Sequence, residues 1–252
     1  MNNQEIAVEN DILRGVVGST AHGTAIDGQD DRDEMGVFIE PPENVCGLSP
    51  IEHYIYRDRP QGVRSQPGDL DLTLYSLRKF CRLATQGNPS VIILLWLPEY
   101  VSCTGIGTDL IAMRQAFISR ESGKRFLGYL TAQKMKLNGE RSKKVNRPDL
   151  VEKYGYDTKF AMHALRLGFE GIEMLTHRRL TLPVAEPNLS TLRAVRGGEV
   201  SKGEALRLIE TAENQLRGLV DDCEWEADRD AINCFMVEAH IEHWSANYPA
   251  LV

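Results

Sequence analysis

Cysteine is scarce and scattered in this sequence of 252 residues. No two cysteines form a Cys-x-x-Cys pair, and their number is odd, so the sequence indicates neither a disulfide framework nor a zinc site. The five cysteines are Cys46, Cys81, Cys103, Cys223 and Cys234.

Long apolar runs are also missing. The longest, residues 91–97, is far shorter than the ~20 residues that a membrane-spanning helix needs. The first residues, MNNQEIAVEND, lack both the basic region and the apolar core of a secretory leader. We therefore expect a cytoplasmic protein.

An excess of positive charge is absent from the chain as a whole. The net charge is -7 and the isoelectric point is about 5.5, which argues against a protein that coats nucleic acid non-specifically, because such binding depends on neutralising phosphates. Residues 120–147 differ, with nine basic and two acidic side chains. The basic residues are Arg120, Lys124, Arg125, Lys134, Lys136, Arg141, Lys143, Lys144 and Arg147.

Apolar residues within this basic segment recur at helical spacing, which predicts an amphipathic helix followed by a basic loop, NGERSKKVNRP. Such a segment is typical of a site for a polyanion, either a nucleoside triphosphate or an RNA, tRNA or DNA strand. The alternative is an ordinary helix with a solvated lysine face.

A Gly-Ser pair and an Asp-x-Asp motif stand close together near the start of the chain. An apolar run ends at Gly18 and Ser19, and Asp31 and Asp33 precede a second apolar run, a pattern that predicts a strand, a tight turn and a second strand. In a strand the two aspartates share one face, about 7 Å apart. Their repulsion favours a bound cation, and carboxylate oxygens suit Mg²⁺ or Mn²⁺.

The phosphate-binding candidates are the glycine and the serine of this pair. Gly18 permits close approach of the backbone to an anion, and Ser19 can donate hydrogen bonds to phosphate oxygens. A third carboxylate follows in the alternating segment GDLDLTLY, where Asp69 and Asp71 share a face. We prefer Asp71, which lies deeper in the run of alternating leucines, although Asp69 competes for the role.

These motifs resemble the DNA polymerase beta nucleotidyltransferase superfamily. The segments GSTAHGTAIDGQDDRDEMGVFIEPPE, GDLDLTLYSLRKFCRLATQGNPSVIILLWLP and GYDTKFAMHALRLGFEGIEML are similar to a predicted nucleotidyltransferase family of bacteria and phages, over the chain to about residue 195. The resemblance implies that Asp31, Asp33 and Asp71 hold two metal ions, that Asp71 helps activate the attacking hydroxyl, and that Gly18 and Ser19 hold the triphosphate.

The motif departs from the superfamily pattern in one respect. Arg32 and Glu34 stand where apolar residues are usual, and we therefore expect the second face of this strand to be less buried than usual.

A helix predicted after Asp157 carries three potential cations on one face. Lys159, His163 and Arg166 are spaced at i, i+4 and i+7, and the resemblance implies that this helix faces the aspartates across a cleft, with the three residues binding the nucleotide. In the alternative, Glu170 and Glu173 continue the same stripe and pair with Arg166 as an exposed ion-pair ladder of little energetic consequence.

Two further groups are weaker candidates. Arg57, Arg59 and Arg64 lie in a stretch rich in proline and glycine that either guides an acceptor or remains in solvent. His240 and His243, with the glutamates beside them, meet no tight metal-ligand spacing, so we assign them to the polar side of a terminal helix.

The sequence thus predicts an α+β protein, with a nucleotidyltransferase-like mixed-sheet domain over residues 1–108 and a mainly helical domain over residues 109–252 that closes the cleft. Its expected activity is metal-dependent transfer of an NMP from an NTP to an acceptor hydroxyl, with release of pyrophosphate and with RNA or tRNA as the favoured acceptor. The alternative is a nucleotide-binding regulatory or antitoxin-like protein that modifies or binds a partner protein.

Overall fold

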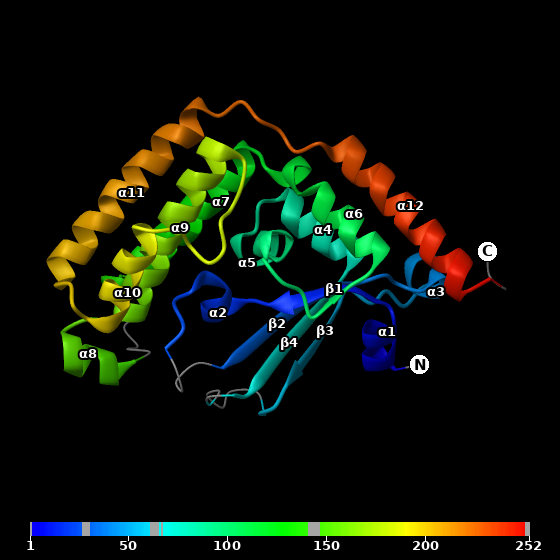
Figure 1. Ribbon diagram of the computed structural model, residues 1–252, viewed down its shortest axis with the longest axis horizontal. Helices are drawn as coiled ribbons and strands as arrows, with labels where there is room; N and C mark the ends of the chain where they lie inside the picture. The colour runs from blue at the N-terminus through cyan, green and yellow to red at the C-terminus, as the bar shows by residue number, and fades with distance from the viewer. Residues whose placement is uncertain (1, 27–30, 61–65, 67, 141–146, 250–252) are drawn as a thin grey trace. The chain divides into compact units, whose positions relative to one another are not determined.

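The computed structural model describes residues 2–26, 31–60, 66, 68–140 and 147–249 (Figure 1). The chain divides into two compact units, each described here by itself. The sheet unit comprises Met1–Thr85, Val91–Phe117 and Ala227–Val252, and the helical unit comprises Gln86–Ser90 and Ile118–Glu226.

The sheet unit is built on a five-stranded mixed sheet in the order β3-β4-β2-β1-β5. The central strands β2 and β4 are parallel, whereas β1 pairs antiparallel with β2 and β5, and β3 pairs antiparallel with β4. The strands are β1 (Asp11–Val16), β2 (Arg32–Phe38), β3 (His53–Arg57), β4 (Leu70–Ser76) and β5 (Ser102–Cys103).

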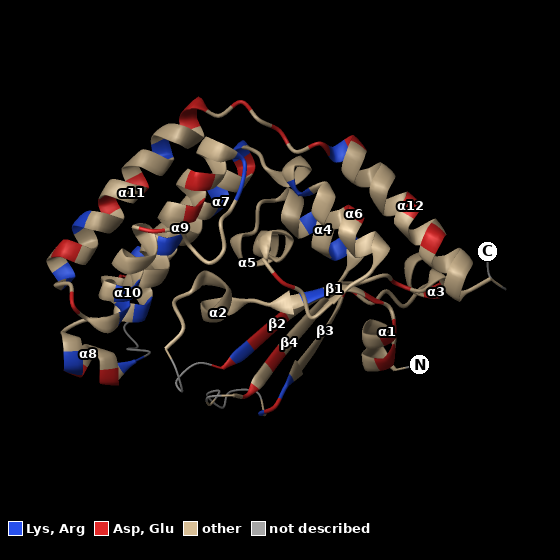
Figure 2. Cartoon of the chain, viewed as in Figure 1, with Lys and Arg blue, Asp and Glu red and all other residues tan. Residues whose placement is uncertain are grey.

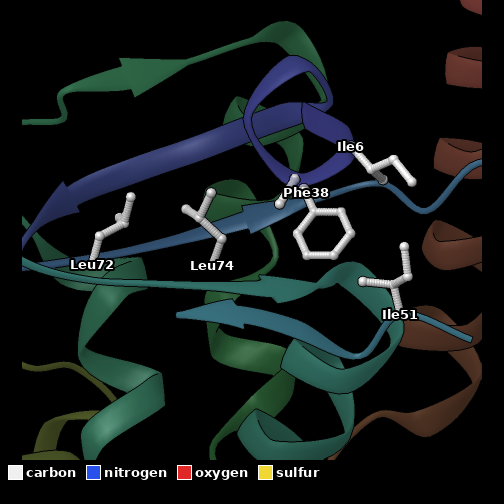
Figure 3. Packing of buried hydrophobic residues seen from close by; sticks show 6 residues of the cluster. Ile6, Phe38, Ile51, Leu72 and Leu74 are labelled. Carbon is white, nitrogen blue, oxygen red and sulfur yellow. The ribbon is translucent and has the colours of Figure 1, made fainter. Parts of the chain in front are cut away.

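Strand β4 alternates between a buried apolar side and a partly buried side that carries Asp71. Leu72 and Leu74 are buried, whereas Asp71 and Thr73, on the opposite face, are only partly buried, as the two-residue period of a strand requires. The two leucines join a core cluster with Phe38 of β2 and with residues of helix α1 (Asn3–Glu9) (Figure 3). This packing fixes which face of the sheet carries the aspartates.

Helix α12 (Arg229–Asn247), at the red end of the colour bar in Figure 1, belongs to the sheet unit although it follows the helical unit in sequence. Its His243 Nε2 lies 2.7 Å from Asn10 Oδ1, and Trp244 Nε1 donates to the Glu40 carbonyl at 2.7 Å. The unit also contains α2 (Gly18–His22), α3 (Pro42–Cys46), α4 (Leu77–Thr85), α6 (Gly105–Ala112) and two short 3₁₀ helices, η1 (Ile93–Trp96) and η2 (Arg114–Phe117).

The helical unit packs around α7 (Arg120–Leu137), α9 (Thr158–His177) and α11 (Lys202–Asp222). Phe126 and Leu130 of α7, Leu165 of α9 and Leu216 of α11 are fully buried, so each helix contributes an apolar stripe to one core. The shorter helices are α8 (Pro148–Tyr154) and α10 (Asn188–Gly197), and α5 (Pro89–Ile92) spans a boundary between the units.

The predicted α+β class is confirmed by the mixed sheet and the mainly helical second part. The predicted start of the helix after Asp157 also agrees, since the Asp157 side chain caps α9. The division of the chain differs from a single boundary near residue 108, because the contacts of α12 with Asn10 and Glu40 place residues 227–252 in the sheet unit. Among the described residues, none of the helices combines the length and apolarity needed to cross a bilayer.

Candidate active site

The parallel pairing of β2 and β4 brings two of the predicted aspartates side by side. Asp33 and Asp71 are register partners across the two strands and therefore project from the same face of the sheet. Acidic residues colour both strands in Figure 2. The parallel pairing of the two strands thus places Asp33 and Asp71 side by side, although they are far apart in the sequence.

Asp31, immediately before β2, completes a cluster of three carboxylates. One oxygen from each of Asp31, Asp33 and Asp71 lies within 4.8 Å of the others, and all three residues are partly buried. Three hard oxygen donors in one small volume suit Mg²⁺ or Mn²⁺. The donor set of this cluster therefore fits the predicted metal.

Gly18 lies against this cluster and has a backbone conformation that favours glycine. Its φ is +68°, and a methyl group added there would overlap the Asp33 carboxylate. The Val17 N–H donates to the Asp33 carbonyl at 2.9 Å, which ties the end of β1 to the cluster. Only a residue without a side chain fits beside Asp33 here.

The connection after Gly18 differs from the predicted tight turn. Residues Gly18–His22 form the short helix α2, with Ser19 partly buried in its first turn. The end of the apolar run at Gly18 predicts a turn, but Ala21 and His22 are buried, which favours a short helical turn packed against the unit.

Asp69 has its own partners and does not join the cluster. Its Oδ2 accepts a hydrogen bond from the Gln66 N–H at 2.8 Å and forms an ion pair with Arg59. The Gln66 hydrogen bond is the main cause that lowers the pKa of Asp69 below its ordinary value, and Arg59 adds to it. The structure thus brings Asp71, and not Asp69, to Asp31 and Asp33.

Arg57 lies beside the third carboxylate, a position that the sequence did not predict. It ends the edge strand β3 opposite Asp71, with its Nε 3.8 Å from Asp71 Oδ1. The alternation HYIYR could have indicated this strand. Arg64, grouped with Arg57 in the sequence, lies outside the described residues.

The second face of β2 is more buried than expected at Glu34. Its side chain is only 7% exposed, and it pairs with Arg32 at 2.7 Å and Arg14 at 3.8 Å. The expectation holds at Arg32, whose side chain is 54% exposed. It is wrong at Glu34, because two arginines compensate the charge of this glutamate and allow it to be buried.

The three predicted nucleotide-binding residues of the helical unit lie on α9 and are all partly buried: Lys159, His163 and Arg166. Arg166 Nη1 lies 2.7 Å from Glu170 Oε2, and the Glu170 side chain is 3% exposed. Arg166 and Glu170 therefore form a largely buried pair rather than an exposed ladder.

The predicted basic segment forms α7 and its flanks. Lys134 pairs with Glu213 at 2.8 Å, and Arg147 pairs with Asp157 at 3.1 Å, so part of the positive charge is neutralised within the unit. Residues 141–146 of the predicted basic loop lie outside the described residues.

The sequence of residues 3–229 matches the family model RlaP, the RNA repair pathway DNA polymerase beta family. The chain belongs to this family. The resemblance inferred from the Gly-Ser and Asp-x-Asp motifs is thereby confirmed at the level of the family, and the matched residues include all of the candidate site residues on β2, β4 and α9.

Among solved structures, the chain is similar to a nucleotidyltransferase-like protein from Exiguobacterium sibiricum 255-15, with 13% sequence identity and a TM-score of 0.32. The similarity covers 87% of this chain and 71% of that chain. No curated protein matches the sequence.

Proposed function

We propose that this chain is a metal-dependent nucleotidyltransferase that moves an NMP from an NTP to an acceptor hydroxyl, with RNA as the acceptor. The observation that carries the proposal is the convergence of Asp31, Asp33 and Asp71, whose carboxylate oxygens lie within 4.8 Å of one another. Three carboxylates held so close favour a cation, and hard cations at such sites serve phosphoryl transfer.

Asp31, Asp33 and Asp71 would hold Mg²⁺ or Mn²⁺, with two ions expected from the family resemblance. When bound, these ions would neutralise charge on the phosphates and make the acceptor hydroxyl more acidic. The fit depends on donor chemistry, since all three side chains offer hard oxygen ligands and are only partly buried, within reach of solvent.

The residues of the chain then have separate roles in the proposed reaction. Asp71 takes the proton of the acceptor hydroxyl, whose oxygen forms a bond to the α-phosphorus of the NTP. The bond between the α-phosphorus and the β-phosphate oxygen breaks, and pyrophosphate leaves with the electron pair. Gly18 allows the triphosphate to approach the backbone beside Asp33, and the Ser19 hydroxyl donates to a phosphate oxygen.

Lys159, His163 and Arg166 remain proposed nucleotide-binding residues of the helical unit. They share one face of α9 and are partly buried, and side chains of this kind bind phosphate oxygens by charge and hydrogen bonds. Glu170 holds the Arg166 guanidinium in one orientation, which reduces the conformational entropy lost when a phosphate binds.

RNA is the favoured acceptor because the family is described as belonging to an RNA repair pathway. The described part of the basic segment supports the same choice, since α7 presents lysine and arginine within an acidic chain.

The test is a transfer assay with each α-labelled NTP, Mg²⁺ or Mn²⁺, and separate pools of RNA and protein. We expect label in the RNA pool with the wild-type chain and a loss of at least about 10³-fold in Asp33→Asn, because a metal ligand is removed. Asp69→Asn is the matched control, since Asp69 is partly buried nearby but binds Arg59 and Gln66, and we expect it to retain most of the activity.

Equal activity in Asp33→Asn and the wild type would show that the metal assignment is wrong. Label in the protein pool alone would replace RNA with a protein acceptor. Nucleotide binding without transfer to either pool would favour the alternative of a nucleotide-binding regulatory or antitoxin-like protein.

A further inference from the structure

The outward side of α7 forms a shallow groove, which we name the α7 groove. It is lined by Lys124, Arg125, Gly128, Tyr129, Ala132 and Lys136, among others, and has a volume of about 590 Å³. A neighbouring hollow of about 440 Å³ shares Lys124, Gly128 and Ala132. All of these residues belong to the helical unit.

The groove exists because two small residues occupy successive turns of the exposed side of α7. Phe126 and Leu130 are fully buried on the inner side, whereas Gly128 and Ala132 are one turn apart on the outer side. A methyl group added at Gly128 would meet nothing within 4 Å. The floor of the groove is therefore open to a ligand.

The groove is basic, although the chain as a whole carries a net charge of -7. Lys124, Arg125 and Lys136 line it, against the single acidic residue Glu121. Lys124 and Glu121 are 3.4 Å apart and both about half exposed, so this pair is weak and leaves Lys124 available to a ligand. The charge of the groove is complementary to a polyanion.

An exposed aromatic ring lies between these cations. Tyr129 is 38% exposed, one helical turn after Arg125 and about two turns before Lys136. By the rise of an α-helix, Arg125 and Lys136 are about 16 Å apart along the axis. A ring flanked by cations over this length is the arrangement on which single-stranded nucleic acids stack a base and pair their phosphates.

We propose that the α7 groove binds single-stranded RNA, with an unpaired base stacked on Tyr129 and phosphates on Arg125 and Lys136. Single strands fit better than duplexes because a base must be unstacked from its neighbours to reach an exposed ring. The choice of RNA rests on the proposed function, but the groove can be tested without turnover.

The experiment measures binding of a fluorescent single-stranded RNA 12-mer by anisotropy, with the full chain carrying Asp33→Asn so that no transfer occurs. We expect Tyr129→Ala to weaken binding by about 5- to 150-fold, the range for loss of one stacked base. Tyr129→Phe keeps the ring and should bind like the parent. A duplex of the same sequence should bind more weakly than the single strand.

The contribution of charge is tested with the double variant Arg125→Ala/Lys136→Ala, which should weaken RNA binding. It should also reduce the magnitude of the slope of log binding constant against log salt concentration by about 1.4, because each phosphate contact to a single strand contributes about 0.7. Lys202→Ala/Arg207→Ala is the matched control. It removes the same charge from exposed positions of α11 in the same unit and should change the affinity little.

The inference is overturned if Tyr129→Ala binds RNA as tightly as the parent, or if both double variants lose the same affinity. It is also overturned if Tyr129→Ala instead changes the oligomeric state in analytical ultracentrifugation, because the groove would then be an interface between copies. If the wild type transfers label to RNA and Tyr129→Ala binds RNA as the parent does, RNA binding by the α7 groove is rejected and the proposed function stands. If RNA binding depends on the groove but the wild type transfers no label, the proposed function is rejected and RNA binding by the groove stands.

Discussion

Two groups of carboxylates, one in each unit of this chain, have opposite surroundings. In the helical unit Glu213 lies 2.8 Å from Lys134 and 3.2 Å from Arg217, and Glu170 lies 2.7 Å from Arg166. In the sheet unit three carboxylates share a volume less than 5 Å across, and Arg57 lies 3.8 Å from one of them. The first arrangement is typical of structural ion pairs, and the second favours an added cation.

This comparison distinguishes charged side chains that stabilise the fold from charged side chains that bind a ligand. A glutamate that is paired within its own unit stabilises the fold, and removing Glu213 takes from the partly buried Lys134 its nearer carboxylate at 2.8 Å and leaves Glu210 at 3.5 Å. Carboxylates that repel one another contribute little to the free energy of unfolding. Their removal therefore has a small effect on stability and a large effect on ligand binding. The following predictions test whether the two groups differ in this way.

The largest effect is expected from Gly18→Ala, which disturbs the carboxylate cluster of the sheet unit directly. The new methyl group overlaps the Asp33 carboxylate, and φ at this position is +68°. We expect Mn²⁺ affinity, measured by calorimetry, to fall by at least about tenfold as Asp33 is displaced. The positive φ adds a backbone cost of about 1 kcal/mol to the loss of stability.

Gly155→Ala is the matched control for this variant. Gly155 has φ +79° but nothing within 4 Å of an added methyl group, so it has the same backbone cost without the overlap. Equal Mn²⁺ affinities in the two variants would contradict a role for Gly18 beside the carboxylates.

An intermediate effect is expected from Glu213→Gln, which removes the ion pair between Glu213 and Lys134 in the helical unit. Burial raises the pKa of Glu213, but the hydrogen bond and charge of Lys134 outweigh it, so the pKa lies below its ordinary value of 4.5. A lowered pKa contributes stability above pH 4.5 that is lost as the pH falls through the folded-state value. We expect Glu213→Gln to lower the free energy of unfolding by about 1 to 3 kcal/mol at pH 7 and by less at pH 3.

Asp33→Asn sharpens the contrast when measured beside Glu213→Gln by urea denaturation without metal. Removing one of three crowded negative charges should leave the stability unchanged or raise it. A loss at pH 7 as large as that of Glu213→Gln would mean that the carboxylate cluster also holds the fold.

The smallest effect is expected from Arg57→Ala. Arg57 places a positive charge 3.8 Å from Asp71 Oδ1 with about half of its side chain exposed. Two charges 4 Å apart interact by about 1 kcal/mol in water, so loss of this competing cation should tighten Mn²⁺ binding about fivefold. Arg82→Ala, which removes an equally exposed arginine paired with Glu52, should leave the affinity unchanged. Weaker binding in Arg57→Ala would contradict competition.

Much of the site could be predicted because its residues lie in strongly patterned segments. The alternation of leucines around Asp71 predicts β4, and Asp157 before an apolar stripe predicts the start of α9. The family resemblance implied that Gly18 and Ser19 hold the triphosphate. The contact of Gly18 with Asp33, where a side chain has no space, became visible only in the structure.

The rest depends on pairings that one sequence does not reveal. The leucine pattern favoured Asp71 over Asp69, but the contacts with Arg59 and Gln66 that Asp69 makes instead depend on the fold. The burial of Glu34 depends on Arg14 from the neighbouring strand β1. No local pattern states which strands will be neighbours, so these contacts become visible only in the folded chain.

The position of α12 also has a consequence for the order in which this protein can be assembled during synthesis. The ribosome completes the helical unit before it makes His243 and Trp244, which bind Asn10 and Glu40 at the opposite end of the chain. Domains generally fold as they emerge, so residues 118–226 can be compact while the unit that carries the aspartates still waits for its last helix. A nascent chain stalled before residue 227 would therefore have a folded middle and an incomplete aspartate-bearing unit.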